Sequence, residues 1–379
     1  MLKIRTAALA LAATLAFGCH EQRPERPITE PTPPVTAPAR EASRPPPPVA
    51  SMSAPAEDDA YPPAEAGCAV AARTGPAQSL QVGSRGATLE GTTLTFPEPA
   101  KDGKLVLGVL GPINETSGQN LLALRKDEAF FAKNHADAIV VTGDVGEVAG
   151  GIERALEELA QTKLPVLVVI GNRECRADFN DGVKAAQKKF SNVVNLDEIR
   201  EVRFPEATLV SLPGYHDPNY INCDTGCRYT QGTLHDVAQL AKASKAPVVL
   251  VSHGPPRGEG SQAIDYAESG GNVGDPAINK VIDEGHIAFG VFSNIKEAGG
   301  RATDLAGTTR VPQDTFVRSL FLNPGPVGAE GWRMNDGTTA HGFAAVLTLQ
   351  NGKGAWKLLQ NPKLTKAELK QARILERSR

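Results

Sequence analysis

Short apolar runs alternate with amphipathic segments along most of the 379-residue chain, and nearly every run stops at a glycine beside a small polar residue. This alternation of strand-like and helix-like patterns favours βαβ units and a largely buried sheet, so the sequence predicts an α/β fold. The expected strands cover residues 105–111, 136–144, 164–172, 207–214, 246–254 and 286–294. The expected helices cover residues 119–134, 152–161, 183–190, 234–244 and 276–285.

Polar residues gather where five of these strands stop. The strand ends read GPIN (111–114), GD (143–144), GN (171–172), SHG (252–254) and FSN (292–294). In open α/β sheets, ligands bind beyond the carboxyl ends of the strands. We therefore expect these side chains to share one site. The segment IGNRE (170–174) is the most unusual of them, since it places an amide, a guanidinium and a carboxylate directly after a buried strand.

In their order, spacing and strand context these motifs resemble those of the calcineurin-like metallophosphoesterases, over roughly residues 103–352. The segment SHGPPRG followed by GDPAINKVID, the later NPG (323–325) and a closing hairpin around an Asn-Gly turn (342–359) are also similar. The resemblance implies an αβ-βα sandwich, in which two mixed sheets are flanked by helices. It also implies a site for two metal ions at the strand ends.

Three family ligand positions are retained. Asp144 stands where the family has the carboxylate that bridges both metals. Asn172 stands at the asparagine ligand of the second metal, and His253 at the lone histidine ligand. With Asn294, these residues form the second-metal site that the resemblance implies.

Five other positions depart from the family pattern. Pro112 and Asn114 replace the aspartate and histidine of the first motif. Arg173 replaces the histidine that protonates the leaving group or steadies the phosphate. Asn294 and Lys296 replace the last two histidines.

These replacements predict a degraded metal site. Proline offers no ligand atom and a protonated lysine repels a divalent cation, so we expect the first metal position to be empty. One carboxylate, one imidazole and two amides are a weak set for zinc or iron. The alternatives are therefore one weakly held divalent ion (Mn, Fe or Zn) or none.

The leading functional hypothesis is a catalytically degenerate member of the family. Without the first metal, nothing obvious lowers the pKa of an attacking water. Arg173 stays charged and cannot act as a general acid. Arg173 and Lys296 would instead hold an anion, such as a phosphate-bearing small molecule, or the domain would bind an envelope protein. The alternative is a working phosphoester hydrolase with a single metal at Asp144, Asn172 and His253.

Each residue also has a local interpretation. Asp144 suits a helix cap, Asn172 a turn, and His253 a buried core histidine. Arg173 suits a surface ion pair with Glu174 or another acid. Only the joint placement of these residues at strand ends favours a site. His286 receives no role, and His216, His235 and His341 match no family motif.

The N-terminus predicts export. Residues 1–19 combine a basic start, an Ala/Leu run and small residues before Cys19, as in a secretory signal peptide. The ending LAFGC resembles a bacterial lipobox, which implies lipid on Cys19 and membrane anchoring. The alternative is an ordinary signal peptide with a chance cysteine. His20 is not the aspartate associated with inner-membrane retention, which favours the outer membrane, periplasm or surface of a Gram-negative bacterium.

Composition sets the domain boundaries. Residues 20–66 hold 13 of the 29 prolines and few large apolar residues, which predicts a disordered tether. We expect one folded domain at 67–360 and a charged tail at 361–379. The net charge of −3 gives no basis for nucleic acid as a partner.

Four cysteines remain if Cys19 carries lipid, and an even number in an exported protein favours disulfides. Cys223 and Cys227 enclose a short loop and suit a local bridge, which would leave Cys68 with Cys175. The sequence allows three pairings. A zinc site at CDTGC is the weaker interpretation, because no second cysteine pair or nearby histidine supports it.

Overall fold

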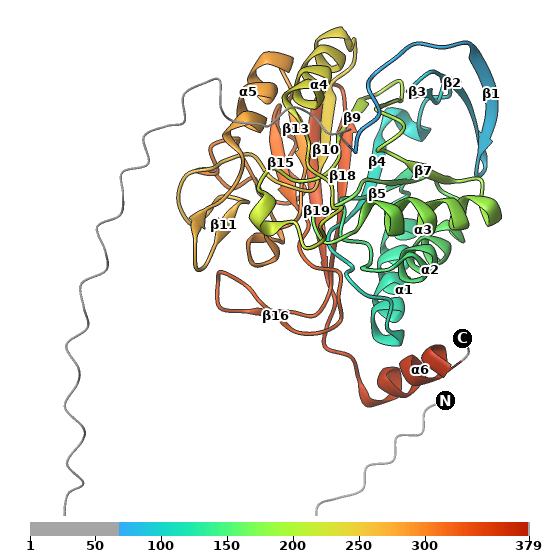
Figure 1. Ribbon diagram of the computed structural model, residues 1–379. Coiled ribbons are helices and arrows are strands. Elements are labelled where there is room, and N and C mark those ends of the chain that lie inside the picture. Colours follow the sequence, from blue (N-terminus) through green and yellow to red (C-terminus); the bar gives the residue numbers. More distant parts are fainter. Residues whose placement is uncertain (1–67, 378–379) are drawn as a thin grey trace, which may run out of the picture. The chain divides into compact units, whose positions relative to one another are not determined.

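Two mixed β-sheets pack face to face, with helices on their outer faces, in the computed structural model of the chain, which describes residues 68–377 (Figure 1). The predicted α/β fold with two mixed sheets flanked by helices is confirmed. The predicted signal peptide, lipidated Cys19 and proline-rich tether lie outside the described residues. Among the described helices, none has the length and apolar character needed to span a bilayer.

One sheet has six strands, of which the four from the first half of the chain run parallel. The hairpin from the C-terminal part adds two antiparallel strands. In spatial order the strands are β19 (Lys353–Gln360), β18 (Phe343–Gln350), β4 (Leu105–Leu110), β5 (Ala138–Val141), β6 (Val166–Val168) and β7 (Val193–Asn195).

The other sheet has nine strands and a parallel centre flanked by antiparallel strands. In spatial order they are β1 (Ala77–Val82), β2 (Arg85–Glu90), β3 (Thr93–Thr95), β8 (Glu201–Arg203), β9 (Thr208–Leu212), β10 (Val248–Ser252), β13 (Phe289–Val291), β15 (Leu320–Asn323) and β14 (Arg301–Thr303).

Helices cover the outer face of each sheet (Figure 1). α1 (Gly118–Lys133), α2 (Ala149–Ala160) and α3 (Arg176–Lys189) pack on the six-stranded sheet, and α4 (Gln231–Ala243) and α5 (Pro276–Gly285) on the nine-stranded sheet. A third apolar cluster fills the space between the sheets. Because both faces of the sheets are buried, their strands read as continuous apolar runs.

The short elements lie in loops. Two-stranded ladders form from β11 (Tyr266–Ala267) with β12 (Gly271–Asn272), and from β16 (Trp332–Arg333) with β17 (Thr339–Ala340). Single 3₁₀ turns occur at η1 (Lys101–Gly103), η2 (Pro218–Tyr220) and η3 (Lys296–Ala298). The η2 and η3 turns and the β16–β17 ladder border the site described below.

The expected charged tail contains a helix, α6 (Lys366–Arg377), that packs against α1. Ala372 of α6 is buried, and Glu368 pairs with Lys126 of α1 at 2.7 Å. Thr365 and Glu368 exchange the side-chain and backbone hydrogen bonds of a capping box at its start. Part of the segment 361–379 therefore belongs to the folded domain.

All four cysteines from Cys68 onward are paired, but not as the local spacing suggested. The bridges join Cys68 to Cys227 and Cys175 to Cys223, so the expected Cys223–Cys227 and Cys68–Cys175 pairs are wrong. Cys223 and Cys227 lie on one loop, and each holds this loop to a different part of the fold. One bridge secures the N-terminal end of the described chain, and the other secures the start of α3.

Glu128 of α1 carries a testable pH dependence. Burial and the neighbouring Glu158 raise the pKa of Glu128 to about 8, against 4.5 for the free side chain. Its Oε1 is buried and has no hydrogen-bond partner among the described residues. Between pH 4.5 and about 8 the unfolded chain releases this proton while the folded chain keeps it. The free energy of unfolding therefore falls as pH rises through this window.

We expect Glu128→Gln to raise the free energy of unfolding at pH 8 by roughly 1–2 kcal/mol and to leave it almost unchanged at pH 4.5. Urea denaturation at both pH values measures the effect. The exposed Glu284 provides the matched control, since Glu284→Gln should change neither value. An equal gain at both pH values would show that burial of the charge is not the cause.

Candidate functional site

Loops after five strands meet at one edge of the sandwich, as the strand-end motifs predicted. Gly143 follows β5 at φ 92°, a conformation that favours glycine. A Cβ on Gly143 would lie 2.7 Å from the Gly171 Cα and 2.7 Å from the His253 Nδ1. The close approach of these loops therefore depends on the glycine that ends β5.

Three polar residues at this edge have a left-handed backbone conformation, which residues other than glycine rarely adopt. Their φ angles are 61° at Asn114, 55° at Asp144 and 29° at Asn294. The backbone oxygen of Asp144 accepts hydrogen bonds from the backbone nitrogens of Ile113 (2.9 Å) and Asn114 (2.8 Å), which ties the loop after β4 to the loop after β5. Strained residues of this kind concentrate at functional sites.

Asp144, Asn172 and His253 come together in a buried cluster, which we call the polar triad. The His253 Nε2 lies 2.9 Å from the Asn172 Oδ1 and 3.4 Å from the Asp144 Oδ1. The Asn172 amide nitrogen donates to the Tyr220 carbonyl at 2.6 Å, which fixes the amide with its oxygen towards His253. The His253 ring is fully buried.

The hydrogen bond made by the Nδ1 of His253 determines which partner its Nε2 requires within the polar triad. The His253 Nδ1 lies 2.8 Å from the Thr142 carbonyl oxygen, to which it donates. The Nε2 then faces two oxygen acceptors, so this side of the ring requires either a proton or a cation. The triad is thus satisfied by an imidazolium or by one metal ion with few protein ligands.

The wider set of family ligand positions does not fit two metal ions. Pro112 offers only a backbone carbonyl, which accepts from the Val327 nitrogen at 3.0 Å. The Asn294 side chain forms a hydrogen bond with Tyr215, a buried residue that is not among the predicted site residues. Nowhere in residues 68–377 do three or more His, Cys, Asp or Glu side chains form a group that could hold a metal ion.

Glu174 stabilises the loops that follow β5 and β6. It is fully buried and accepts hydrogen bonds from the backbone nitrogens of Gly171 and Val145. Burial and the adjacent Asp144 carboxylate raise the pKa of Glu174. The carboxylate of IGNRE therefore points inward and holds the loops after β5 and β6 together, rather than pairing with Arg173.

Arg173 turns outward. Its guanidinium pairs with Glu147 of the loop before α2, and this contact raises the pKa of Arg173. Its backbone nitrogen donates to the Asp144 Oδ1 at 3.1 Å. The predicted surface ion pair of Arg173 is present. Its partner is Glu147 and not Glu174. The Arg173 Nε is buried and makes no hydrogen bond within the described part of the chain.

Lys296 begins η3, and its ammonium lies 4.6 Å from the centroid of the Trp332 ring. Burial lowers the pKa of Lys296, while the Asp144 carboxylate acts in the opposite direction. Lys296, Arg173 and Asn114 line the same cavity of about 290 Å³, together with Trp332 from the β16–β17 ladder. We call this space the strand-end cavity. Three of the four substituted positions that carry polar side chains, Asn114, Arg173 and Lys296, therefore converge on this cavity.

Sequence reasoning missed three contributors. Tyr215 follows the glycine at the end of β9, so the strand-end rule could have identified it. Glu147 and Trp332 lie in loops without a motif, and only the fold brings them to the cavity.

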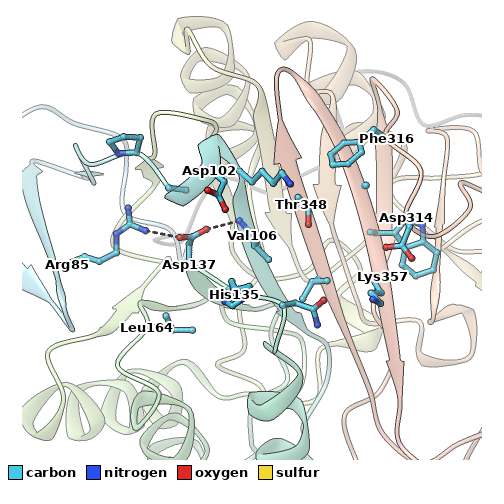
Figure 2. A pocket seen from close by; sticks show the side chains of 18 of the residues that line it. Arg85, Asp102, Val106, His135, Asp137, Leu164, Asp314, Phe316, Thr348 and Lys357 are labelled. Atoms are coloured by element: carbon cyan, nitrogen blue, oxygen red, sulfur yellow. Dashed lines mark hydrogen bonds and ion pairs between the residues drawn. The ribbon is translucent and has the colours of Figure 1, made fainter. Parts of the chain in front are cut away.

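A larger cavity of about 850 Å³ lies elsewhere, near the starts of β4 and β5 (Figure 2). Figure 2 shows Asp137 between the Arg85 guanidinium, at 3.6 Å, and the Val106 backbone nitrogen, at 2.9 Å. Arg85 also donates to the Glu98 carbonyl. The charged and polar groups named here already have partners within the protein. The larger volume of this cavity is therefore not sufficient reason to choose it as the candidate site.

Comparisons with known proteins give similarity to solved structures at low identity. No protein family and no curated protein matches the chain. Solved structures do match. TT1561 of Thermus thermophilus is 14% identical over 67% of this chain and 98% of its own length, with a TM-score of 0.46. A dimetal phosphatase from Danio rerio is 13% identical over 68% and 99%, with a TM-score of 0.44.

GAP50, the anchor in the inner membrane complex of Plasmodium, is 14% identical over 71% of this chain and 93% of its own, with a TM-score of 0.43. Similarity at this level concerns chain arrangement alone. The chemistry of the site therefore rests on the residues of this chain.

Proposed function

We propose that the chain is a metallophosphoesterase-like protein that binds a phosphate-bearing ligand in the strand-end cavity and does not hydrolyse it. The observation that carries the proposal is the convergence of Asn114, Arg173 and Lys296 on one cavity. In the family these positions hold a metal ligand, the proton donor and another metal ligand. Here they offer an amide and two cationic groups, which bind an anion without activating water.

Hydrolysis lacks its two main requirements. Two cations normally stabilise the charge that develops on phosphorus and lower the pKa of the attacking water. Lys296 provides one fixed charge and no hydroxide. Arg173 provides hydrogen bonds, but its raised pKa keeps the guanidinium protonated, so it offers no transferable proton.

We expect the purified protein to show no turnover of p-nitrophenyl phosphate with added Mn²⁺, Zn²⁺ or Fe²⁺ beyond that of Asp144→Asn. Continuous absorbance at saturating substrate measures this. Metal-dependent turnover that disappears in Asp144→Asn would contradict the proposal and favour the hydrolase below.

Binding should depend on Lys296. We expect Lys296→Met to weaken the binding of inorganic phosphate at least tenfold, which is about 1.4 kcal/mol, because the half-buried ammonium is the main cation of the cavity. Isothermal titration calorimetry measures the change. Lys104→Met, which removes an exposed lysine of the larger cavity, is the matched control and should bind phosphate as the unmodified protein does. Equal affinities in all three proteins would contradict the assignment.

One observation favours a second candidate, a single-metal hydrolase. The His253 Nε2, the Asn172 Oδ1 and the Asp144 Oδ1 converge from three strand ends, as ligands of one ion would. Bound to them, a metal ion would supply a Lewis acid for a phosphoester oxygen. Elemental analysis after purification without chelators discriminates between the candidates. A stoichiometric metal lost in His253→Ala supports the hydrolase, and metal-free protein supports the binding role.

We also propose that the protein is exported and held at the cell envelope by lipid on Cys19. The two disulfides of the folded domain support this, because disulfides persist in oxidising compartments. Metabolic labelling with palmitate tests it. Label should enter the unmodified protein and not Cys19→Ala, and equal labelling would contradict the anchor.

A further inference from the structure

The strand-end cavity has a cationic part. Lys296 and Arg173 lie on its lining, and the Arg173 Nε is buried without an acceptor among residues 68–377. Arg173 pairs with Glu147, whereas Lys296 makes no ion pair of 4.0 Å or less in the described part of the chain, although the Asp144 carboxylate acts on its ammonium. This part of the cavity is complementary to one anionic group.

The same cavity also has an acidic part. Glu115 and Glu330 line it, both are exposed, and neither has an ion-pair partner in the described part of the chain. The Asn114 Oδ1 is buried and accepts no hydrogen bond there. The buried amide oxygen needs a hydrogen-bond donor and the two carboxylates favour a cation, and an anion alone supplies neither. These carboxylates would weaken, without abolishing, the binding of a ligand that is only an anion.

Trp332 adds an aromatic ring to the lining that holds the carboxylates. Trp332 is 42% exposed as a residue, although Lys296 lies over its ring at 4.6 Å. Indole rings attract ammonium groups through the negative face of the ring. The ring, Glu330 and Glu115 together form a surface that suits a ligand ammonium.

The volume limits the ligand. About 290 Å³ lies at the small end of the range for small-molecule pockets, roughly 300–1,000 Å³. The cavity therefore holds one phosphate and a short linker with a second charged group, and little more.

From these observations we infer that the ligand is a small zwitterion, a phosphate ester that carries an ammonium on a short alkyl linker. Its phosphate lies against Lys296 and the Arg173 Nε, and its ammonium lies against Glu115, Glu330 and Trp332. The inference rests on the proposed phosphate-binding function and names the class of ligand for that site.

Calorimetry with the full-length protein and three matched probes tests the inference. O-Phosphoethanolamine carries both charges, propyl phosphate lacks the ammonium, and ethanolamine lacks the phosphate. We expect O-phosphoethanolamine to bind at least tenfold more tightly than propyl phosphate, and ethanolamine to bind least. The double variant Glu115→Gln/Glu330→Gln should reduce the preference to below threefold without weakening propyl phosphate. Glu98→Gln, on the larger cavity, is the control and should keep the full preference.

The outcomes separate the two proposals. Equal binding of O-phosphoethanolamine and propyl phosphate would overturn the zwitterion and leave the phosphate-binding function standing. No binding of any phosphate would overturn both. A preference that persists in the double variant would overturn the assigned carboxylates.

The same chemistry occurs free and as a lipid headgroup, and flotation of Cys19→Ala with vesicles distinguishes the sources. Flotation with phosphatidylethanolamine/phosphatidylglycerol vesicles but not with pure phosphatidylglycerol supports the headgroup. Its absence, with retained binding of O-phosphoethanolamine, supports the free ester.

Discussion

Replacing Cys68 and Cys227 with serine is expected to lower the free energy of unfolding by about 5 kcal/mol. The bridge joins residues 159 apart, and the entropy that a cross-link removes from the unfolded chain grows with loop length. Cys227 is fully buried, so the variant also leaves two hydroxyls in an apolar position. Guanidinium denaturation under non-reducing conditions measures the loss.

The second disulfide provides the comparison. Cys175 and Cys223 are 48 residues apart, and the same relation gives about 4 kcal/mol for their removal. This bridge also lies beside the site, because the Asn222 nitrogen donates to the Asn172 carbonyl and the Tyr220 carbonyl holds the Asn172 amide. We therefore expect the Cys175→Ser/Cys223→Ser variant alone to lose phosphate affinity in conditions where both variants remain folded. Equal affinity in the two variants would show that the bridge does not order the site.

Much of the fold could be predicted from the sequence because the signal was local. The strands β4, β5, β9 and β10 are apolar runs of strand length that end at glycine. The β18–β19 hairpin turns at Asn351 and Gly352, whose φ angles of 50° and 71° suit an Asn-Gly turn. Buried parallel strands and tight turns impose their requirements on adjacent residues, so the sequence shows them directly.

The remaining features depend on contacts distant in sequence. The strands β1 to β3 are short and carry many polar residues; β1 pairs with β2, β2 with β3, and β3 with β8, so their place in the sheet depends on partners distant in sequence. The start of α6 could have been recognised from Thr365 and Glu368, since their spacing is that of a capping box. Its packing on α1 could not, because the charged composition suggests a solvated tail.

The candidate site divides in the same way. The positions of Asp144, Asn172 and His253 after strand ends predicted that they would lie close together, and they do. Arg173 pairs with another acid, as one of the two predicted alternatives had it, because Glu174 faces inward and Glu147 comes from another loop. A sequence pattern indicates which residues end a strand. It does not indicate whether a carboxylate after the strand, such as Glu174, faces the interior or the solvent.

The polar triad has a structural role that requires no metal ion. His253 follows β10 of the nine-stranded sheet, and its Nδ1 donates to the carbonyl of Thr142, which follows β5 of the six-stranded sheet. Ser293 donates to the same carbonyl at 2.9 Å from the loop after β13. The imidazole therefore links the two sheets at the edge where the strand-end cavity lies.

We accordingly expect His253→Ala to lower the free energy of unfolding by about 3 kcal/mol in EDTA, where no metal contributes. The variant leaves the Thr142 carbonyl with one donor fewer, removes the group between Asp144 and Asn172, and creates a cavity in a fully buried position. Urea denaturation measures the loss. His235→Ala removes an exposed imidazole of α4 and should stay within about 0.5 kcal/mol of the unmodified protein. If His253→Ala were as stable as the unmodified protein in EDTA, the histidine would serve a ligand rather than the fold, and the single-metal candidate would gain the advantage.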